Sequence, residues 1–253
     1  MAKEFDGKIA LVTGASSGIG RATALAFAEK GARVCAADVN IEGGNETVKL
    51  IEKAGGKAFF VKCDISKASD VKAMVGAVVK KFGRLDFAHN NAGIEGKTAS
   101  TADCTEENWD KTIGINLKGV WLCMKFEIPV MLKQGGGAIV NTSSVAGLIG
   151  FQGIPAYVAS KHGIIGLTKT AALEYSKANI RVNVVCPGVI QTPMIERFTA
   201  GNPEAEKQLI ATTPMARVGQ PKEIANAVVW LCSDKASYVT GHALVADGGM
   251  TVQ

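Results

Sequence analysis

Short apolar runs alternate with longer helical patterns along nearly the whole 253-residue chain, and this alternation limits the folds that the chain can adopt. Seven runs have the length and composition of β-strands, at residues 8–14, 32–38, 58–64, 84–93, 137–144, 180–188 and 242–249. Strands that are apolar on both faces and joined by helices are typical of a parallel sheet covered on both sides. Residues 1–253 are therefore predicted to form a single α/β domain, a Rossmann-type doubly wound sheet of about seven parallel strands.

One segment, at 189–216, breaks this alternation. It has little strand character and contains three prolines, Pro193, Pro203 and Pro214. It follows the carboxyl end of the strand predicted at 180–188, which is where ligands bind in such folds. We therefore predict that 189–216 forms a lobe that covers a substrate.

The composition argues against several classes of protein. The net charge is +5, but the basic residues are scattered, which predicts a solvated surface rather than a nucleic-acid-binding stripe. No apolar stretch approaches the ~20 residues of a membrane span, and the charged start lacks the apolar run of an export signal. The six cysteines lie far apart and the three histidines show no metal-ligand spacing. We expect reduced thiols, a cytoplasmic protein, and no metal, nucleic-acid or membrane partner.

A glycine-rich turn, TGASSGIG at 13–20, follows the first predicted strand and opens the first predicted helix. Its glycines are Gly14, Gly18 and Gly20. Glycine permits a tight turn and a close approach of a ligand to the backbone, and the first turn of a helix offers free N–H groups to a pyrophosphate. Many strand-to-helix turns use glycine, so the turn alone is weak evidence. The order of strand, turn and helix nevertheless predicts dinucleotide binding.

Asp38 ends the second predicted strand. A carboxylate there can accept hydrogen bonds from both hydroxyl groups of an adenosine ribose and would repel a 2′-phosphate. The next residues are Val39 and Asn40, so no basic side chain directly follows to hold such a phosphate. The alternative is a surface aspartate at a strand end. In combination with the glycine turn, Asp38 favours NAD over NADP as the cofactor.

Tyr157 and Lys161 are four residues apart in the helix predicted at 155–177, so both lie on one face of it. A free tyrosine has a pKa near ~10. A nearby ammonium and a positive nicotinamide ring would lower that pKa, so we predict a phenol that exchanges a proton with an alcohol or a carbonyl near neutral pH. Ser144, at the end of the fifth predicted strand, can hold the same oxygen. Ser143 is its rival, because adjacent strand residues point to opposite faces.

In combination, these motifs resemble those of the short-chain dehydrogenase/reductase family, over nearly the whole chain. The segment NNAG at 90–93 resembles the family's fourth-strand motif, and PGVIQTPM at 187–194 resembles the segment that holds the nicotinamide carboxamide. By this resemblance, the catalytic tetrad is Asn116, Ser144, Tyr157 and Lys161. Lys161 is also expected to hold the nicotinamide ribose, and the backbone of Asn116 to hold a water in a proton relay.

The resemblance also implies which residues contact ligands. Asp64 is expected at the adenine, and Ile190 and Thr192 at the carboxamide. The substrate oxygen is expected at Ser144 and Tyr157. The expected cofactor contacts are Gly14, Ser16, Ser17, Gly18, Ile19, Gly20, Asp38, Asp64, Ile65, Asn91, Ala92, Gly93, Tyr157, Lys161, Pro187, Gly188, Ile190 and Thr192.

For two histidines and the three tryptophans, we expect a role in packing or at the surface rather than in catalysis or ligand binding. His162 is expected to pack, and His89 to pack or to face solvent. The tryptophans lie in helical patterns and are expected to fill the core or an interface, at Trp109, Trp121 and Trp230.

Two long helical segments, 105–134 and 155–177, bear on assembly. Thr105 is the expected N-cap of the first, and Pro155 starts the second. The second is rich in small apolar residues, and within the family such a helix often packs against a second subunit. The resemblance therefore predicts a homotetramer built on these two segments.

The predicted function is hydride transfer between NAD and a neutral, moderately hydrophobic secondary alcohol or its ketone, possibly cyclic. The segments at 94–96 and 145–150 are mostly apolar, and no cluster of arginines is evident for a charged substrate. The motifs resemble those of dichlorocyclohexadiene-diol dehydrogenases, cyclohexanol-oxidising members and proteins labelled glucose 1-dehydrogenase. The alternatives are an NADPH-dependent 3-oxoacyl-thioester reductase and a non-catalytic dinucleotide-binding regulator.

Overall fold

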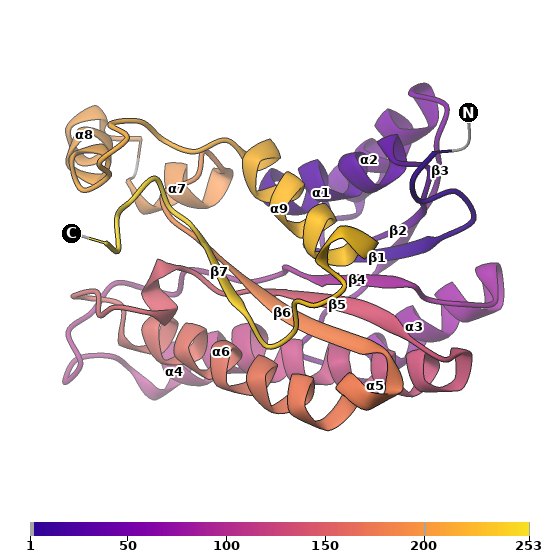
Figure 1. Ribbon diagram of the computed structural model, residues 1–253. Coiled ribbons are helices and arrows are strands. Elements are labelled where there is room, and N and C mark those ends of the chain that lie inside the picture. The colour runs from indigo at the N-terminus through magenta and orange to yellow at the C-terminus, as the bar shows by residue number, and fades with distance from the viewer. Residues whose placement is uncertain (1–2, 200, 253) are drawn as a thin grey trace.

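Seven parallel strands form one central sheet (Figure 1). The structure is a computed structural model and describes residues 3–199 and 201–252. The strand order is β3-β2-β1-β4-β5-β6-β7, so the direction of winding reverses between β1 and β4. The strands are β1 (Ile9–Thr13), β2 (Arg33–Asp38), β3 (Lys57–Lys62), β4 (Phe87–Asn90), β5 (Gly137–Thr142), β6 (Ile180–Pro187) and β7 (Ala243–Ala246). The predicted Rossmann-type doubly wound sheet is confirmed.

Helices cover both faces of the sheet (Figure 1). On one face lie α1 (Gly18–Glu29), α2 (Ile41–Lys53) and α9 (Pro221–Cys232). On the other lie α3 (Ala68–Phe82), α4 (Glu106–Ile113), α5 (Gly119–Gln134) and α6 (Pro155–Tyr175). Side chains alternate between two apolar cores, as they must in a sheet buried on both faces. Phe87 of β4 packs with α1 and α9, whereas the next residue, Ala88, packs with α3 and α5.

Strand β4 is shorter than the apolar run at 84–93 predicts. It pairs only over Phe87–Asn90, because the residues on either side bind elsewhere. The Asn91 backbone N–H donates to Thr13 Oγ1 at 3.0 Å, and its side-chain amide donates to the Thr13 carbonyl at 3.1 Å. The chain after β4 is thereby tied to the end of β1.

The segment 105–134 is helical, but it is not one continuous α-helix. Thr105 accepts a hydrogen bond from the Asn108 backbone N–H at 3.2 Å, which confirms it as the N-cap of α4. A π-helical turn at Gly114–Lys118 then separates α4 from α5. Such turns accommodate an extra residue and are frequent at functional sites. This one contains Asn116.

The segment 189–216 contains two short helices, α7 (Pro193–Phe198) and α8 (Pro203–Ala211). Each begins at a proline, whose fixed φ suits the first helical position and whose missing N–H costs nothing there. In Figure 1 both lie beyond the carboxyl ends of the strands.

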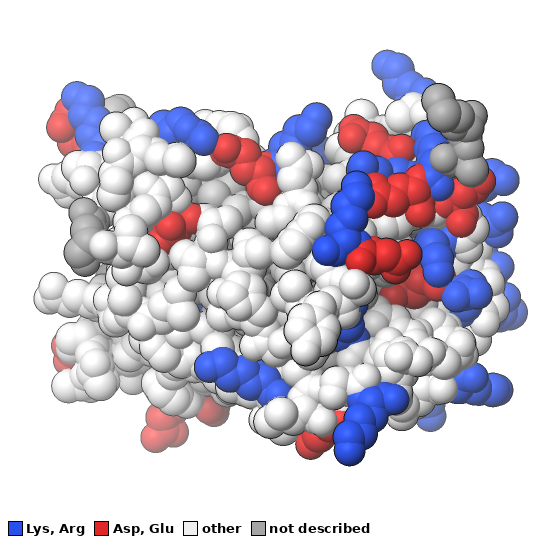
Figure 2. Space-filling model, in the orientation of Figure 1, with Lys and Arg blue, Asp and Glu red and all other residues white. Residues whose placement is uncertain are grey.

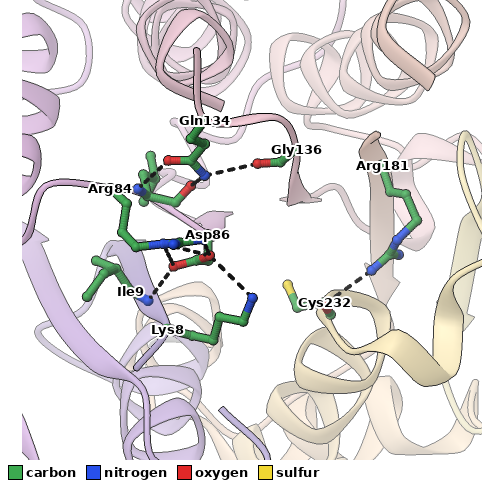
Figure 3. A network of polar contacts seen from close by, with 9 residues as sticks. Lys8, Ile9, Arg84, Asp86, Gln134, Gly136, Arg181 and Cys232 are labelled. Atoms are coloured by element: carbon green, nitrogen blue, oxygen red, sulfur yellow. Dashed lines mark hydrogen bonds and ion pairs between the residues drawn. The ribbon is translucent and has the colours of Figure 1, made fainter. Parts of the chain in front are cut away.

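A buried polar network occupies the opposite end of the strands (Figure 3). The Asp86 carboxylate accepts from the Ile9 backbone N–H at 2.9 Å and from the Arg84 guanidinium, and it forms an ion pair with Lys8 at 3.6 Å. Gln134 binds both the N–H and the carbonyl of Leu85 through its side-chain amide. These contacts join the starts of β1 and β4 to the end of α5.

The surface residues correct two interpretations. Trp109, Trp121 and Trp230 are 41, 41 and 39% exposed, so of the two interpretations the core is wrong, and an interface stays a prediction. His162 is also exposed rather than packed, and its ring N–H donates to the Val158 carbonyl at 3.0 Å. All four lie on helix sides that face solvent.

The thiols and charges agree with the composition. All six cysteines are unpaired, and all but the half-buried Cys104 are buried. On the face shown in Figure 2, charges of both signs lie together along the top and right, and the middle is largely without charged side chains. Within residues 3–199 and 201–252, no helix has the length and apolar character that crossing a membrane requires.

Candidate active site

A cavity of about 580 Å³ opens at the carboxyl ends of the strands. Its walls are built by the residues that end or follow each of the seven strands, from Gly14 after β1 to Met250 after β7. In doubly wound sheets this is the edge at which ligands bind. The following predicted site residues line it: Gly14, Ser16, Ser17, Gly18, Ile19, Asp38, Asp64, Ile65, Asn91, Ala92, Gly93, Ser144, Tyr157, Lys161, Pro187, Gly188, Ile190 and Thr192.

The glycine turn forms one wall of this cavity. Gly14 and Gly18 have φ values of 66° and 52°, a backbone conformation that favours glycine. A Cβ on Gly14 would lie 2.8 Å from the Asn91 side chain. Helix α1 begins here, and its N-cap, Ser17, makes no side-chain hydrogen bond to the helix. The first N–H groups of α1 therefore remain available to an anion such as a pyrophosphate.

Gly20 has a different place from the one predicted. It is buried, does not line the cavity, and a Cβ there would lie 2.1 Å from the Gly14 carbonyl oxygen. Its role is to let α1 pack tightly against the turn. The prediction that it contacts a cofactor is not supported by this position.

Asp38 is held firmly at the end of β2. Its two carboxylate oxygens accept from the backbone N–H groups of Ser16, at 3.0 Å, and Asn40, at 2.9 Å. Each oxygen keeps a further lone pair, and the side chain lines the cavity. The residues present therefore fit an adenosine ribose next to the glycine turn.

Ser144, Tyr157 and Lys161 meet in the middle of the cavity wall. Lys161 is buried, and its ammonium donates to the carbonyl of Thr142, at the end of β5, at 2.9 Å. Its Nζ lies 5.4 Å from the centre of the Tyr157 ring. The one-turn spacing along α6 places the two side chains together, as the sequence predicts.

Comparison with known proteins identifies this arrangement. A family model described as enoyl-(acyl carrier protein) reductase matches residues 14–251, nearly the whole chain. The chain belongs to the short-chain dehydrogenase/reductase family. It is accordingly an oxidoreductase of the kind that acts on CH–OH groups.

Three relatives are similar over almost their whole length. A cyclohexanol dehydrogenase from an Acinetobacter species is 47% identical over 251 residues, which cover 99% of this chain and 98% of the relative. A 2,5-dichloro-2,5-cyclohexadiene-1,4-diol dehydrogenase from Sphingobium indicum is 44% identical, and 98% of each chain is covered. A 3-oxoacyl-(acyl-carrier-protein) reductase from Thermotoga maritima is also 44% identical, covering 98% of this chain and 99% of the relative.

Solved structures agree with this family assignment. Levodione reductase superposes with a TM-score of 0.96 at 38% identity, covering 98% of this chain and 99% of the other. An NAD⁺-bound xylitol dehydrogenase superposes with a TM-score of 0.93 at 36% identity, covering 98% of this chain and 100% of the other.

The structure distinguishes the two candidate serines of this short-chain dehydrogenase/reductase. Ser143 is 2% exposed, and its hydroxyl donates to the Lys161 carbonyl at 2.8 Å. Ser144 is less buried, its hydroxyl accepts from the Ala146 backbone N–H at 3.1 Å, and its hydrogen is left for another acceptor. Ser144 is therefore better placed to hold a substrate oxygen.

Asn116 lies behind the cavity wall rather than in it. Its side-chain oxygen accepts from the Ile94 backbone N–H at 2.8 Å, and its amide donates to the Ile94 carbonyl at 2.9 Å and to Ser160 Oγ at 3.3 Å. The Asn116 side chain thus fixes the loop after β4 against α6. The water relay predicted at its backbone stays a prediction.

The pKa of Tyr157 departs from expectation. Burial raises it to about 12; the Ser144 hydroxyl opposes this rise, and the Glu95 carboxylate adds to it. Burial also lowers the pKa of Lys161 to about 8, and its ammonium binds the Thr142 carbonyl. Without a nicotinamide ring, the loss of solvent around the phenol dominates its pKa, and the lowering predicted for Lys161 together with a bound nicotinamide stays a prediction.

A charged pair in the cavity wall is absent from the sequence-based prediction. Arg197 of α7 binds Glu95, in the loop after β4, through two hydrogen bonds of 2.7 and 3.2 Å. Both line the cavity, although the segment at 94–96 is described above as mostly apolar. The two residues are 102 positions apart, so no local pattern could have revealed the pair.

Proposed function

We propose that this protein is an NAD-dependent dehydrogenase of neutral, moderately hydrophobic cyclic secondary alcohols, working in either direction. The observation that carries the proposal is the convergence of Ser144, Tyr157 and Lys161 on one cavity whose other walls are largely apolar. Apolar residues near the proposed reaction site include Ile94, Val145, Phe151, Ile154, Met194 and Phe198. Such walls favour a ring of carbon atoms over a charged chain.

The glycine turn and Asp38 support NAD as the cofactor. The open N-terminus of α1 suits a pyrophosphate, and Asp38 suits a ribose with both hydroxyls free. Arg21, in the first turn of α1, already donates to Ser16, Gly43 and Thr47, and these bonds hold its guanidinium against the start of α2. A bound nicotinamide would supply the hydride acceptor or donor.

The residues of this chain then transfer the proton to and from the substrate oxygen. The Ser144 hydroxyl donates to the substrate oxygen and orients it toward the Tyr157 phenol. Tyr157 takes the alcohol proton during oxidation and returns it during reduction. Lys161, fixed by the Thr142 carbonyl at 2.9 Å, provides positive charge beside the ring. That charge favours the phenolate, which oxidation requires.

The relatives support a cyclic alcohol. Two of them are named as dehydrogenases of cyclohexanol and of a cyclohexadiene diol. We propose further that 189–216 covers the substrate, since α7 contributes Met194, Ile195 and Phe198 to the cavity.

The test is a panel of initial rates followed at the absorbance of reduced nicotinamide. Cyclohexanol, cyclohexanediols, linear secondary alcohols and glucose are each assayed with NAD and with NADP, and a 3-oxoacyl thioester is assayed with NADH and with NADPH. We expect the ring alcohols with NAD to give the highest kcat/KM. Turnover confined to 3-oxoacyl thioesters with NADPH would contradict the proposal, and so would the absence of turnover with every substrate.

The second candidate is the NADPH-dependent 3-oxoacyl-thioester reductase. The Thermotoga maritima relative of that name is nearly as similar as the ring-alcohol enzymes. Asp38 and the hydrogen bonds that already hold Arg21 weigh against it. A non-catalytic regulator is disfavoured, because a sensor needs no buried tyrosine–lysine pair at its ligand.

We also propose a cytoplasmic homotetramer. Buried free thiols suit a reducing compartment. Helices α5 and α6 expose Trp121 and Leu173, and a broad surface around edge strand β7 is largely free of charged side chains in Figure 2. Apolar exposed surface of this kind marks interfaces. Light scattering at micromolar concentration should give four subunits, and a monomer would contradict this.

A further inference from the structure

Glu95 and Arg197 form the most unusual feature of the cavity wall. Their hydrogen bonds, at 2.7 and 3.2 Å, join the loop after β4 to helix α7. The Glu95 side chain is 23% exposed and that of Arg197 is 59% exposed. The carboxylate is therefore the buried end of the pair, and the guanidinium is its solvent end.

Glu95 lies at the reactive end of the cavity. The charged residues that line the cavity are Asp38, Asp64, Glu95, Lys161 and Arg197. Asp38 ends β2 and Asp64 follows β3, on the proposed adenosine side of the sheet. Glu95 instead follows Gly93, where a Cβ would lie 3.8 Å from Lys161 Nζ, and Ile94, whose backbone binds the Asn116 side chain. A carboxylate thus stands near the phenol among apolar walls.

The chemistry of this carboxylate defines what it can bind. Although burial has the opposite effect, the hydrogen bonds from Arg197 hold the pKa of Glu95 below its ordinary value, so the group stays ionised. Each oxygen accepts one N–H from Arg197 and keeps a further lone pair. It can accept a hydrogen bond from a neutral hydroxyl, and it would repel a carboxylate or a phosphate.

We propose that Glu95 determines specificity by accepting a hydrogen bond from a second hydroxyl group on the substrate ring. The first hydroxyl is the one oxidised beside Tyr157. This inference rests on the proposed function, and it narrows the substrate class to ring alcohols that carry two hydroxyl groups. The names of the relatives include both a mono-alcohol and a diol, so they leave the choice open.

The test compares kcat/KM with NAD for cyclohexanol and for the 1,2-, 1,3- and 1,4-cyclohexanediols. A hydrogen bond to a charged group corresponds to roughly ten- to hundredfold in kcat/KM. We expect wild type to prefer at least one diol by about tenfold or more. Glu95→Gln should lower that ratio by about tenfold, and because the ratio is taken within one variant, it cancels any change at Tyr157 that affects both alcohols.

Two further variants separate a direct contact between Glu95 and the substrate from an indirect effect, in which the ion pair with Arg197 only holds α7 in place. Arg197→Gln breaks the pair but leaves the carboxylate, so the diol preference should persist within about threefold. Glu196→Gln is the matched control, because Glu196 is an exposed neighbour on α7 that does not line the cavity. Circular dichroism and thermal melting establish that each variant is folded.

The outcomes are distinct. An unchanged diol ratio in Glu95→Gln overturns the role of Glu95 and leaves the proposed function standing. Equal losses of the diol preference in Glu95→Gln and Arg197→Gln would show that the ion pair only holds α7 in place, and this also overturns the proposal. If wild type oxidises none of the four alcohols with NAD, both the proposed function and this inference fail.

Discussion

Polar groups at the amino ends of the strands are bonded to other groups of the chain, whereas several at the carboxyl ends face the cavity. At the amino ends of the strands, Asp86 binds Ile9, Arg84 and Lys8, and Arg181 donates to the carbonyls of Leu231, Cys232, Ser233 and Val239 (Figure 3). Arg181 thereby takes up carbonyls that the end of α9 leaves without helical partners. Every one of these contacts lies within the chain.

At the carboxyl ends, polar groups remain open. The N-terminus of α1 has no side-chain cap, and the Ser144 and Tyr157 hydroxyls face a cavity. Satisfied groups stabilise a fold, whereas open groups are stabilised by a ligand. The comparison assigns stability to the first end and chemistry to the second.

The largest effect should come from Tyr157→Phe. The phenol is the proposed proton carrier, so we expect kcat to fall by about a thousandfold. The ring that packs in the cavity is kept, so the melting temperature and NAD binding should change little. Turnover within tenfold of wild type would contradict the assignment. Stopped-flow or steady-state rates with a ring alcohol provide the measurement.

The same residue gives a pH dependence. Oxidation requires the phenolate, and burial raises the pKa of Tyr157 to about 12 in the protein alone. The phenolate fraction therefore grows throughout the range from about pH 6 to 10, and the oxidation rate should rise with it. Lys161, whose pKa is lowered to about 8, loses its charge in that range, so the rise should become shallower above it. A flat profile, with hydride transfer rate-limiting, would argue against this role.

Asp86→Ala tests the polar network at the amino ends of the strands. It removes a charge-assisted hydrogen bond and leaves the buried Ile9 N–H without an acceptor, so the free energy of unfolding should fall by about 4 kcal/mol. The kcat of the folded fraction should stay within about twofold. Asp86→Asn, which keeps an acceptor for Ile9, should cost less. Urea unfolding provides the energies, and a large loss of kcat without loss of stability would break the comparison.

Glu127 lies between the two ends, in α5, with one oxygen unpartnered and the other bound by Asn90 at 3.0 Å. Burial raises its pKa from 4.5 to about 7, against a lowering by Asn90. As pH rises from 4.5 to 7, the unfolded chain loses this proton before the folded one does. The free energy of unfolding should fall across this window, and the loss should persist above it.

Glu127→Gln should remove that loss, because the amide stays neutral. We expect it to stabilise the protein by roughly 3 kcal/mol at pH 8 and to have little effect at pH 4. Urea titrations of both proteins at the two pH values measure the difference. An equal effect at both values would mean that packing rather than charge is responsible.

The smallest effect expected is on cofactor choice. Asp38→Ala should reduce the NAD-to-NADP ratio of kcat/KM by roughly ten- to hundredfold, the equivalent of one charged hydrogen bond. Adding arginine at Val39 should reduce it further, because a guanidinium grips a phosphate. If wild type prefers NADP, or if Asp38→Ala leaves the NAD-to-NADP ratio of kcat/KM unchanged, Asp38 does not bind the adenosine ribose.

Much of this molecule follows from local sequence. The strand-and-helix alternation predicts the sheet, because burial on both faces demands continuous apolar runs. The positions of the glycine turn, Asp38 and the Tyr157–Lys161 pair can be predicted from the sequence, because each lies within one helix or strand or at its end. Strand ends and helix turns have fixed geometry, so residues in them can be located from spacing alone.

Other features were decided only by tertiary packing. The sequence cannot show that Asn116 clamps Ile94, that Ser143 turns toward Lys161, or that Glu95 meets Arg197 across 102 positions. The same holds for the pKa of Tyr157, where the spacing to Lys161 predicts a lowering and burial produces a rise. Spacing determines which groups share an element, whereas solvent exclusion and contacts between distant segments depend on everything that packs around them.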